Sequence, residues 1–292
     1  MAKPETTVGQ VVLARVEEQA AVLAGLDEAV RADEPDAVHR MRVACRRLRS
    51  ALRTFRRLFA PGATDELVAE LRWLGGALGG ARDREVLAER LAAQARELPA
   101  GCGPERVAAA LERWGETEYR RVWPEVVAAL DSPRRRDLGD ALAALLADPP
   151  LRRRADRPAV AELSRIAARE QRRTADRVRT ALAAGPGERD GALHAARKAA
   201  KRARYAGETA APAAGRRAER YTERMKAVQE VLGEHQDAVV AAAALAAQAS
   251  AGGEPFGYGV LYGRQLAAEQ AARERLPGVW KRAGKPKLAR FG

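Results

Sequence analysis

Two arginine-rich segments of this chain carry the residue types that bind phosphate. The first, residues 39–49, reads HRMRVACRRLR, and the second, residues 194–204, reads HAARKAAKRAR. Each has a histidine at its first position and a basic side chain three, seven, eight and ten residues later. Guanidinium groups bind oxyanions through charge-assisted hydrogen bonds, and a histidine protonated beside a phosphate donates two more. The two segments therefore predict the binding of a polyanion.

The spacing of these segments indicates an internal duplication. Their histidines, two of only three in the chain, lie 155 residues apart (39 to 194). A Leu-Gly pair followed by Asp at residues 78–83 recurs 154 residues later at 232–237, and Arg72 recurs as Lys226 at the same distance (72 to 226). Repeats of this length predict two similar helical bundles rather than a solenoid of short units.

Composition supports the same fold class. The 292 residues suffice for one large domain or two ordinary ones, with a substantial core. Alanine dominates, aromatic residues make up only 4%, and β-branched runs with period two are absent, which favours helices. The net charge of +13 predicts a polyanionic partner: nucleic acid, an acidic membrane face or a phosphate polymer.

The cysteine content and the apolar segments indicate the cellular compartment. Two cysteines in a chain of this length, Cys45 and Cys102, are typical of a reducing compartment. The first residues contain no apolar signal core. The longest apolar stretch, residues 238–247, is about half of the roughly 20 residues that cross a bilayer. We expect a soluble cytoplasmic protein without a membrane partner.

Hydrophobic residues recur with helical spacing, interrupted by proline and glycine. Asp36 is a natural N-cap for the first basic helix. Gly79 and Gly233 are typical of residues that end a helix, and Asp83 and Asp237 of residues that cap the next one. In the first half we expect helices from about 8 to 30, 36 to 60, 64 to 78, 83 to 98 and 104 to 130.

The clearest linker follows the first half. Two adjacent prolines at 149 and 150 cannot sit inside a helix, and the arginines after them resist burial. We expect a single domain over residues 8–275. It would consist of an N-terminal bundle (8–148), a linker (149–155) and a C-terminal bundle (156–275). A basic tail over 277–292 would follow, either as an ordered lid or as a loose arm.

Each basic segment, placed on a helix, forms a cationic stripe directly beside an apolar one. The first apolar stripe consists of Val38, Met41, Cys45, Leu48, Leu52 and Phe55, and its cationic neighbour of His39, Arg42, Arg46, Arg49, Arg53 and Arg56. The second apolar stripe consists of Leu193, Ala196, Ala200 and Ala203, and its neighbour of His194, Arg197, Lys201 and Arg204. A stripe beside a buried seam borders a helix–helix interface, so two such stripes can line one shared groove.

The alternative is that these stripes are ordinary solvated surface, where arginine stems cover apolar neighbours. That interpretation suits a single basic helix better, but the duplicated spacing favours a common groove. Arg72 and Lys226 are candidates to line it. His235 has no counterpart in the first half and is treated as incidental. The Leu-Gly…Asp elements are interpreted as structural, with the two carboxylates orienting nearby arginines as the lesser alternative.

These segments, with residues 78–83 and 232–237, closely resemble the CHAD family, the conserved histidine α-helical domain. The resemblance runs from about residue 8 to about 275. It implies an all-α fold of two pseudo-twofold-related four-helix bundles with a central basic groove or pore, and binding of inorganic polyphosphate. The phosphate contacts that it implies are His39, Arg42, Arg46, Arg47, Arg49, His194, Arg197, Lys201, Arg202 and Arg204. The stripe and the basic run add Arg53 and Lys198, and the matched positions of the repeat add Arg72 and Lys226.

The second copy departs from the first. Ala203 stands where the first copy has Leu48, and Glu208 where it has Arg53, so we expect the first half to contribute more to binding. The triphosphate-tunnel domain that is fused to many family members has no clear counterpart. Residues 116–120, its nearest imitation, lie on a helical pattern and end in arginine. We expect a stand-alone module.

Catalytic residues are scarce. The sequence has no glycine-rich phosphate loop, no metal-spaced cluster and no Gly-x-Ser-x-Gly elbow. We therefore expect a polyphosphate-binding protein without catalysis, cofactor or metal, associated with polyphosphate granules. A nucleic-acid-binding helical protein is the main alternative. A polyphosphate-processing enzyme and a groove that receives an acidic protein tail rank lower. The sequence leaves the oligomeric state open.

Overall fold

The computed structural model describes residues 6–252 and 254–292, except for the side chains of residues 81 and 82. Over these residues the chain is helical, without a β-strand of more than an isolated bridge. The predicted all-α fold is confirmed. The helices of the first half are α1 (Val8–Ala24), α2 (Asp27–Arg31), α3 (Ala37–Thr54), α4 (Asp65–Ala77), α5 (Gly79–Arg96), α6 (Pro104–Asp131) and α7 (Pro133–Ala147). Those of the second half are α8 (Ala159–Ala183), α9 (Pro186–Ala214), α10 (Arg216–Ser250) and α11 (Pro255–Ala283).

The duplication is visible in the order of the helices. α1, α4 and α6 begin 151 residues before α8, α10 and α11 (8 to 159, 65 to 216 and 104 to 255), and α3 corresponds to α9. The pair α4 and α5 together corresponds to the single long helix α10. α2 and α7 are additions to the first half, and α7 packs against α1, α4 and α6.

Several predicted helix ends are wrong. Gly233 lies inside α10, which continues without a break, and only Leu78 separates α4 from α5. Neither glycine therefore ends a helix and neither Asp83 nor Asp237 caps one. α10 stays continuous here because Leu232 and Gly233 are both buried, and this packing outweighs the low helix propensity of glycine. In the first half, α1 ends at Ala24 and α3 at Thr54, earlier than predicted.

Asp36 is the N-cap residue of α3, as predicted, but it adopts a left-handed conformation with φ 60°. Its side chain does not accept the expected capping hydrogen bond. This backbone conformation is uncommon outside glycine, asparagine and aspartate, and it turns the chain sharply from α2 into α3.

Two hydrophobic cores hold the molecule together. The larger one draws residues from α1, α3, α4, α8, α9 and α10, and therefore joins both halves. The smaller one joins the far ends of α5 and α6 to those of α10 and α11, through side chains such as Leu91, Leu111, Leu245 and Leu261. The molecule consequently forms a ring that is closed at both ends.

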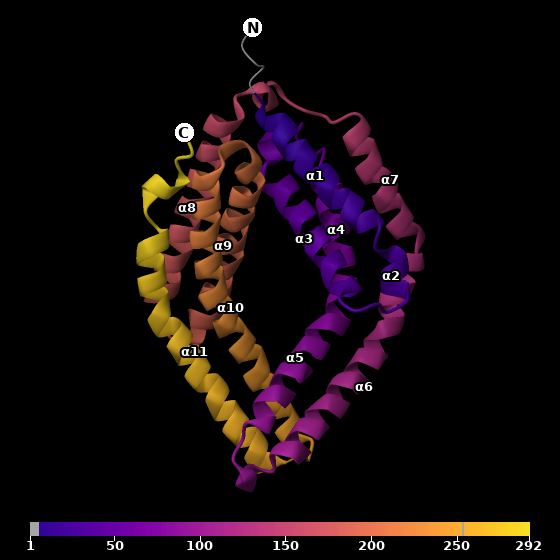
Figure 1. The fold of residues 1–292 in the computed structure, drawn as a ribbon, viewed down its shortest axis with the longest axis vertical. Helices are drawn as coiled ribbons and strands as arrows, with labels where there is room; N and C mark the ends of the chain where they lie inside the picture. The colour runs from indigo at the N-terminus through magenta and orange to yellow at the C-terminus, as the bar shows by residue number, and fades with distance from the viewer. Residues whose placement is uncertain (1–5, 253) are drawn as a thin grey trace.

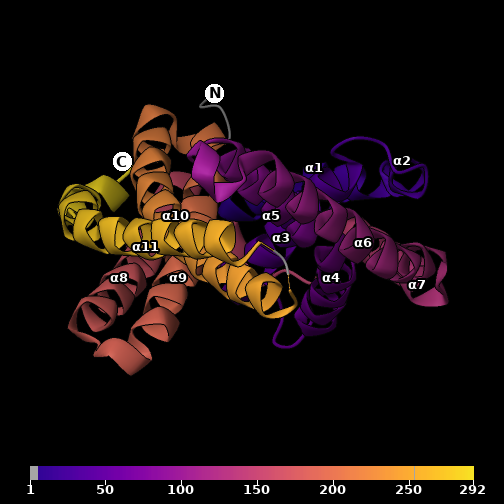
Figure 2. The same ribbon diagram turned by 90° about the horizontal axis from the view of Figure 1, so that it is seen from below.

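The ribbon shows this ring directly (Figure 1), with α3 and α5 on one side of its middle and α9 and α10 on the other. In the view from below, the α5–α6 and α10–α11 arms cross near the centre of the molecule (Figure 2). Gly257 lies at this crossing. A Cβ atom there would lie 2.5 Å from Cγ2 of Val107 and 2.8 Å from the carbonyl oxygen of Cys102, so the arms approach as closely as they do only because residue 257 is glycine.

The predicted basic tail is ordered. Pro277 lies inside α11, which continues to Ala283, and the 3-10 helix η4 (Pro286–Ala289) then packs against α8 and α10. Phe291 is 4% exposed, and its backbone N–H donates to Oγ of Ser164 at 3.0 Å. The last residues therefore belong to the larger core.

The connection between the halves is also fixed. The carboxylate of Glu162 is fully buried, and Arg154, Arg157 and Arg165 surround it at 2.6, 3.4 and 3.0 Å. These ion pairs tie the residues before α8 to its first turn. Within the part of the chain that the structure describes, no helix is long and apolar enough to cross a membrane.

Candidate polyanion-binding groove

Two adjoining hollows lie between α3 and α4 of the first half and α8 and α9 of the second. Their volumes are about 980 and 430 Å³, and both are lined by Arg49, Arg53, Arg173 and Arg202. We call the two together the central groove. Its cationic lining consists of Arg46, Arg49, Arg53, Arg56, Arg57, Arg72, Arg169, Arg173, Arg177, Lys198, Lys201 and Arg202. Only two lining residues, Asp65 and Glu170, are acidic, and both border the larger hollow.

The apolar seams of α3 and α9 position this lining. Met41 and Leu48 on α3, and Ala200 and Ala203 on α9, have no exposed surface. The small seam of α9 allows it to pack directly against α3. Because each cationic stripe borders its seam, this packing brings the two basic helices to the edge of one interface.

Unbalanced positive charge shifts the titration of the groove residues. Burial, together with repulsion from the nearby guanidinium groups of Arg46 and Arg197, lowers the pKa of Lys201 to about 7. Burial, followed by repulsion from Arg53, also lowers the pKa of Arg49. A site in which burial and like charges oppose protonation of a lysine is one that a bound anion stabilises.

The Leu-Gly…Asp elements hold an arginine in each half. Arg42 donates two hydrogen bonds to Asp83, at 2.7 and 2.9 Å, and Arg197 lies 3.8 Å from the carboxylate of Asp237. A Cβ atom at Gly79 would touch the Arg42 guanidinium at 3.4 Å, so a larger residue would displace it. The carboxylates therefore orient arginines, the alternative that sequence reasoning ranked second.

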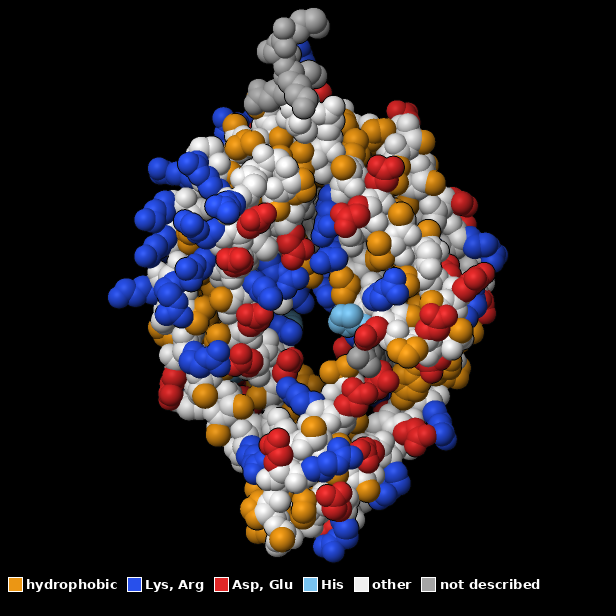
Figure 3. Space-filling model, viewed as in Figure 1, with side chains coloured by type: hydrophobic (Ala, Val, Ile, Leu, Met, Phe, Trp, Pro, Cys, Tyr) orange, Lys and Arg blue, Asp and Glu red, His pale blue; other side chains and the backbone are white. Residues whose placement is uncertain are grey.

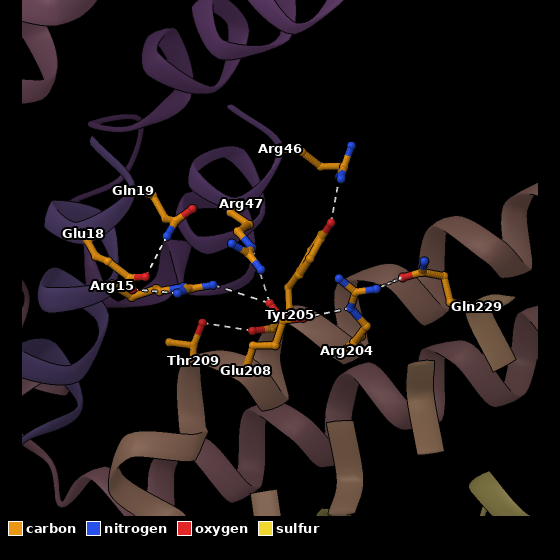
Figure 4. Close-up of polar contacts among 10 residues, drawn as sticks. All are labelled: Arg15, Glu18, Gln19, Arg46, Arg47, Arg204, Tyr205, Glu208, Thr209 and Gln229. Atoms are coloured by element: carbon orange, nitrogen blue, oxygen red, sulfur yellow. Dashed lines mark hydrogen bonds and ion pairs between the residues drawn. The ribbon is translucent and has the colours of Figure 1, made fainter. Parts of the chain in front are cut away.

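Glu208 on α9 contacts three other arginines where α1, α3 and α9 meet (Figure 4). It lies 3.4 Å from Arg15, 3.6 Å from Arg47 and 2.9 Å from Arg204, and so ties α1 and α3 to α9. Arg204 also donates to Oε1 of Gln229 on α10. Arg47 and Arg204 are therefore engaged in ion pairs outside the central groove, whose walls they do not line.

The predicted site residues fall into two groups. The groove lining includes seven of them: Arg46, Arg49, Arg53, Arg72, Lys198, Lys201 and Arg202. The lining does not include the other seven, namely His39, Arg42, Arg47, His194, Arg197, Arg204 and Lys226. Among these, His39 is exposed. His194 shares a hydrogen bond of 2.6 Å with Gln236, and Lys226 pairs with Glu230 at 3.5 Å.

Sequence reasoning missed the contribution of α8. Arg169, Arg173 and Arg177 line the groove at four-residue spacing, which places them on one face of that helix. The spacing itself was a usable signal. It was obscured because α8 carries six arginines, among which Arg165, Arg172 and Arg179 point elsewhere and do not line the groove. Arg56 and Arg57, just beyond α3, also contribute.

The space-filling view shows an opening through the middle of the ring (Figure 3). Basic side chains gather along its upper border, a histidine lies on its rim, and acidic side chains are mixed with basic ones below. The upper end of the opening is therefore more positive than the lower end.

The third histidine lies outside the groove. His235 is 3% exposed, with Nε2 3.5 Å from Oδ1 of Asp190, and burial lowers its pKa. It is thus a buried interface residue rather than a lining residue of the groove. Among the residues that the structure describes, no group of three or more His, Cys, Asp or Glu side chains is placed to hold a metal ion.

Comparison with known proteins finds a matching family model and related chains. The family model described as CHAD domain matches residues 14–246. The uncharacterized proteins MT2285 and Rv2226, from two strains of Mycobacterium tuberculosis, are each 37% identical over 279 residues, or 92% of this chain. The chain spans about half the length of these two relatives, 52% of each.

Two solved structures share the fold. PptA from Streptomyces chartreusis superposes with a TM-score of 0.77 at 24% identity, covering 94% of this chain and 99% of that one. The crystal structure of the CHAD domain from the plant Ricinus communis gives a TM-score of 0.69 at 23% identity, covering 97% and 93%.

Proposed function

Because this chain belongs to the CHAD domain family, we propose that its central groove binds inorganic polyphosphate. Family membership supports a polyphosphate-related role. The observation that carries the proposal is the charge of the lining: twelve lysine and arginine residues face two carboxylates. A linear polyanion neutralises such a groove along its length, whereas a single phosphate would leave most of the charge unbalanced.

The aromatic residues of the groove support polyphosphate over single-stranded nucleic acid. Base stacking requires exposed aromatic faces. The aromatic rings of the lining are Trp73 and Tyr205. Tyr205 is 5% exposed and accepts a hydrogen bond from Arg46, and the guanidinium of Arg134 covers the ring of Trp73 at 4.3 Å. Tyr205 is therefore unavailable as a stacking platform, and one face of Trp73 is already covered.

A competition titration tests the proposal. Labelled long-chain polyphosphate is bound at physiological salt and displaced by unlabelled polyphosphate, single-stranded DNA or RNA at matched phosphate concentration. We expect polyphosphate to compete at least tenfold better than either nucleic acid, and binding to weaken steeply with salt because counterions are released. Equal competition by RNA would replace the proposal with its main alternative.

Charge reversal locates the site. The groove variant combines Arg49→Glu, Arg173→Glu and Lys201→Glu. The matched control combines Arg120→Glu, Arg121→Glu and Arg136→Glu, which change the net charge equally on the exposed faces of α6 and α7. We expect the groove variant to lose binding and the control to retain it, with unchanged helical circular dichroism in both. Equal loss in the control would mean that binding follows net charge alone.

The cellular counterpart of this proposal is association with polyphosphate granules and binding without turnover. A fluorescent fusion is expected to co-localise with granules and to become diffuse when the groove variant replaces it. Incubation of the protein with polyphosphate is expected to release no orthophosphate. Measurable release that the groove variant abolishes would instead assign the groove an enzymatic role.

A further inference from the structure

A second basic surface lies on the far side of the C-terminal half. It consists of nine exposed residues from the start of α10, the end of α11 and the last residues: Arg216, Arg217, Arg220, Arg224, Lys281, Arg282, Lys285, Lys287 and Arg290. We call it the terminal basic patch. In Figure 3, basic side chains crowd the left edge of the molecule, where Figure 1 places the end of α11 and the C-terminus.

The fold brings these residues together. α10 packs along α11, and η4 packs against α10 and α8. Arg217 donates a hydrogen bond to the carbonyl oxygen of Phe291, and the rings of Tyr221 and Phe291 meet edge to face at 5.7 Å. The C-terminal segment is therefore fixed beside the first turns of α10, so that its lysines add to the arginines of that helix.

The patch is distinguished by how many of its cations lie together without ion pairs among the described residues. Several exposed arginines elsewhere are paired, as Arg134 is with Glu70 and Arg31 with Asp131. None of the nine patch residues forms an ion pair with any residue that the structure describes. Glu219 and Glu223 lie three residues after Arg216 and Arg220 on α10 and so border the cations, but neither forms an ion pair with a patch residue among those that the structure describes.

The patch is separate from the central groove. The groove is lined from α3, α4, α8 and α9, and the patch lies on α10, α11 and η4. The interior of the bundle lies between them, including Tyr221, whose hydroxyl donates to the carbonyl oxygen of Ala167 on α8. Packed helices are about 8–10 Å apart, so the two surfaces are separated by about a Debye length or more at physiological salt. Each can therefore hold its own anion.

We propose that the terminal basic patch is a second polyphosphate-binding surface, through which one molecule bridges two polyphosphate strands. This inference rests on the proposed function of the groove. The patch is exposed and shallow, so its binding is weaker and more sensitive to salt than that of the enclosed groove. Bridging would convert a polyphosphate-binding protein into one that gathers polyphosphate chains together.

The number of bound oligophosphates tests the second site. Isothermal titration of the full chain with a short oligophosphate, too short to span both surfaces, is expected to give two sites per molecule at low salt. The patch variant, Arg220→Glu, Arg224→Glu and Lys285→Glu, is expected to retain the tighter site alone. The groove variant is expected to retain only the weaker one, and the control variant on α6 and α7 both. One site in the wild-type protein that the patch variant leaves unchanged would overturn the proposal but not the function of the groove.

Light scattering with long-chain polyphosphate tests bridging. The wild-type protein and the control variant are expected to form large particles near charge equivalence. The patch variant is expected to bind polyphosphate without forming them. Particles of undiminished size with the patch variant would overturn bridging.

The patch variant is also tested against other polyanions. If it retains both oligophosphate sites but loses binding to phosphatidylserine vesicles or RNA, the patch belongs to another partner. Absence of any polyphosphate binding by the wild-type protein would instead remove the proposed function itself.

Discussion

Arg42 and Asp83 face each other across the α3–α5 junction as a bidentate ion pair, with both Nη atoms within 2.9 Å of a carboxylate oxygen. The second half repeats the pair in looser form, with 3.8 Å between Arg197 and Asp237. The duplication therefore preserved a contact between side chains, not only the pattern of helices. Since Asp83 occupies both Nη atoms of Arg42, the carboxylate competes with any phosphate that approaches this arginine.

Removing both carboxylates is therefore expected to strengthen binding. Asp83→Asn with Asp237→Asn frees two guanidinium groups and removes two negative charges. Because the side chain of Asp83 is 70% exposed, the pair contributes no more than about 1 kcal/mol to stability. We expect polyphosphate affinity to rise by roughly two- to tenfold at low salt, measured by fluorescence titration, with little change in melting temperature. Weaker binding would mean that the carboxylates hold the arginines in the binding geometry.

The groove arginines and the Glu208 arginines are expected to respond differently to neutralisation. Arg49→Gln with Arg173→Gln removes two groove cations, and each charge-assisted contact contributes on the order of 1–3 kcal/mol. We expect a loss of at least tenfold in polyphosphate affinity without a loss of stability, and a smaller dependence of affinity on salt.

The matched pair, Arg47→Gln with Arg204→Gln, removes the same charge from the arginines that surround Glu208. It leaves the carboxylate of Glu208, 20% exposed, with fewer partners. We expect this variant to lose roughly 1–3 kcal/mol of unfolding free energy and therefore to melt at a lower temperature. It should bind polyphosphate nearly as well as the wild type. Circular dichroism melting and titration of the two variants side by side separate the roles. A larger affinity loss in the Arg47 and Arg204 variant would place the binding surface on that side.

Polyphosphate binding is expected to depend on pH through Lys201. In the free protein, burial and the surrounding guanidinium groups lower the pKa of this lysine to about 7. A bound polyanion raises the pKa again, so binding takes up a proton as pH rises above 7, and affinity falls by up to about tenfold per pH unit. Lys201→Arg keeps the charge at every pH and should flatten this dependence.

Calorimetry in buffers of different ionisation enthalpy measures the proton uptake. The free protein shows the complementary effect, since the unfolded chain retains the lysine proton up to its usual pKa near 10.5. Unfolding free energy should therefore increase between pH 7 and about 10, and this increase should be smaller in Lys201→Met. Identical pH profiles for the wild type and Lys201→Arg would show that Lys201 does not titrate with binding.

Glu162 is expected to govern how the two halves are joined. Burial opposes its ionisation, but hydrogen bonds from Arg154 and Arg165 outweigh burial and lower its pKa below the usual value. Glu162→Gln leaves three arginines around a neutral side chain, and we expect it to destabilise the fold by roughly 2–4 kcal/mol at pH 7.

The stability from this carboxylate is complete above the unfolded pKa of about 4.5 and is lost as pH falls through the lower folded value. The difference in unfolding free energy between wild type and Glu162→Gln should therefore shrink in acid. Urea unfolding at pH 7 and pH 3.5 measures it. A difference that is constant across this range would exclude ionisation of Glu162 as its source.

The central part of the site could be predicted because α3 and α9 encode it locally. Each helix carries its buried seam and its cationic stripe in one continuous segment, and the nearly equal offsets of the histidines (39 to 194) and the aspartates (83 to 237) relate the two. Arg173 and Arg177 were not predicted because six arginines spread over one broad face of α8, and only tertiary packing selects the part of that face that meets the groove. The ion pairs of Glu208 were not predicted for a similar reason. They depend on where α1 and α3 meet α9, and no local pattern specifies that.

The ends of the helices were also predicted poorly from the sequence. Glycine and aspartate at 232–237 match the pattern of a helix stop, yet α10 passes through them. The same residues lie beside a contact instead, since a Cβ atom at Gly233 would stand 3.7 Å from the guanidinium of Arg197, at ordinary van der Waals distance. A residue that permits a close approach and one that ends a helix look alike in a single sequence, because both are glycine.

The last prediction concerns the closure of the ring. It compares two glycines on α11, Gly257 and Gly259. A Cβ atom at Gly257 would clash with Val107 and with the backbone of Cys102, whereas one at Gly259 would meet nothing within 4 Å. Gly257→Ala should force the two arms apart and destabilise the fold by roughly 1–3 kcal/mol. Gly259→Ala should stabilise it by about 0.5–1 kcal/mol, because alanine favours the helix.

Hydrogen exchange distinguishes local from global effects. In Gly257→Ala, amides near the crossing of the α5–α6 and α10–α11 arms should exchange faster, while those of α3 and α9 should keep their protection. The groove is built on the larger core, so polyphosphate affinity should stay within about twofold of the wild type. If Gly257→Ala weakened binding as strongly as the groove variant does, closure of the ring would itself be required to shape the groove, and the two cores would act as one unit.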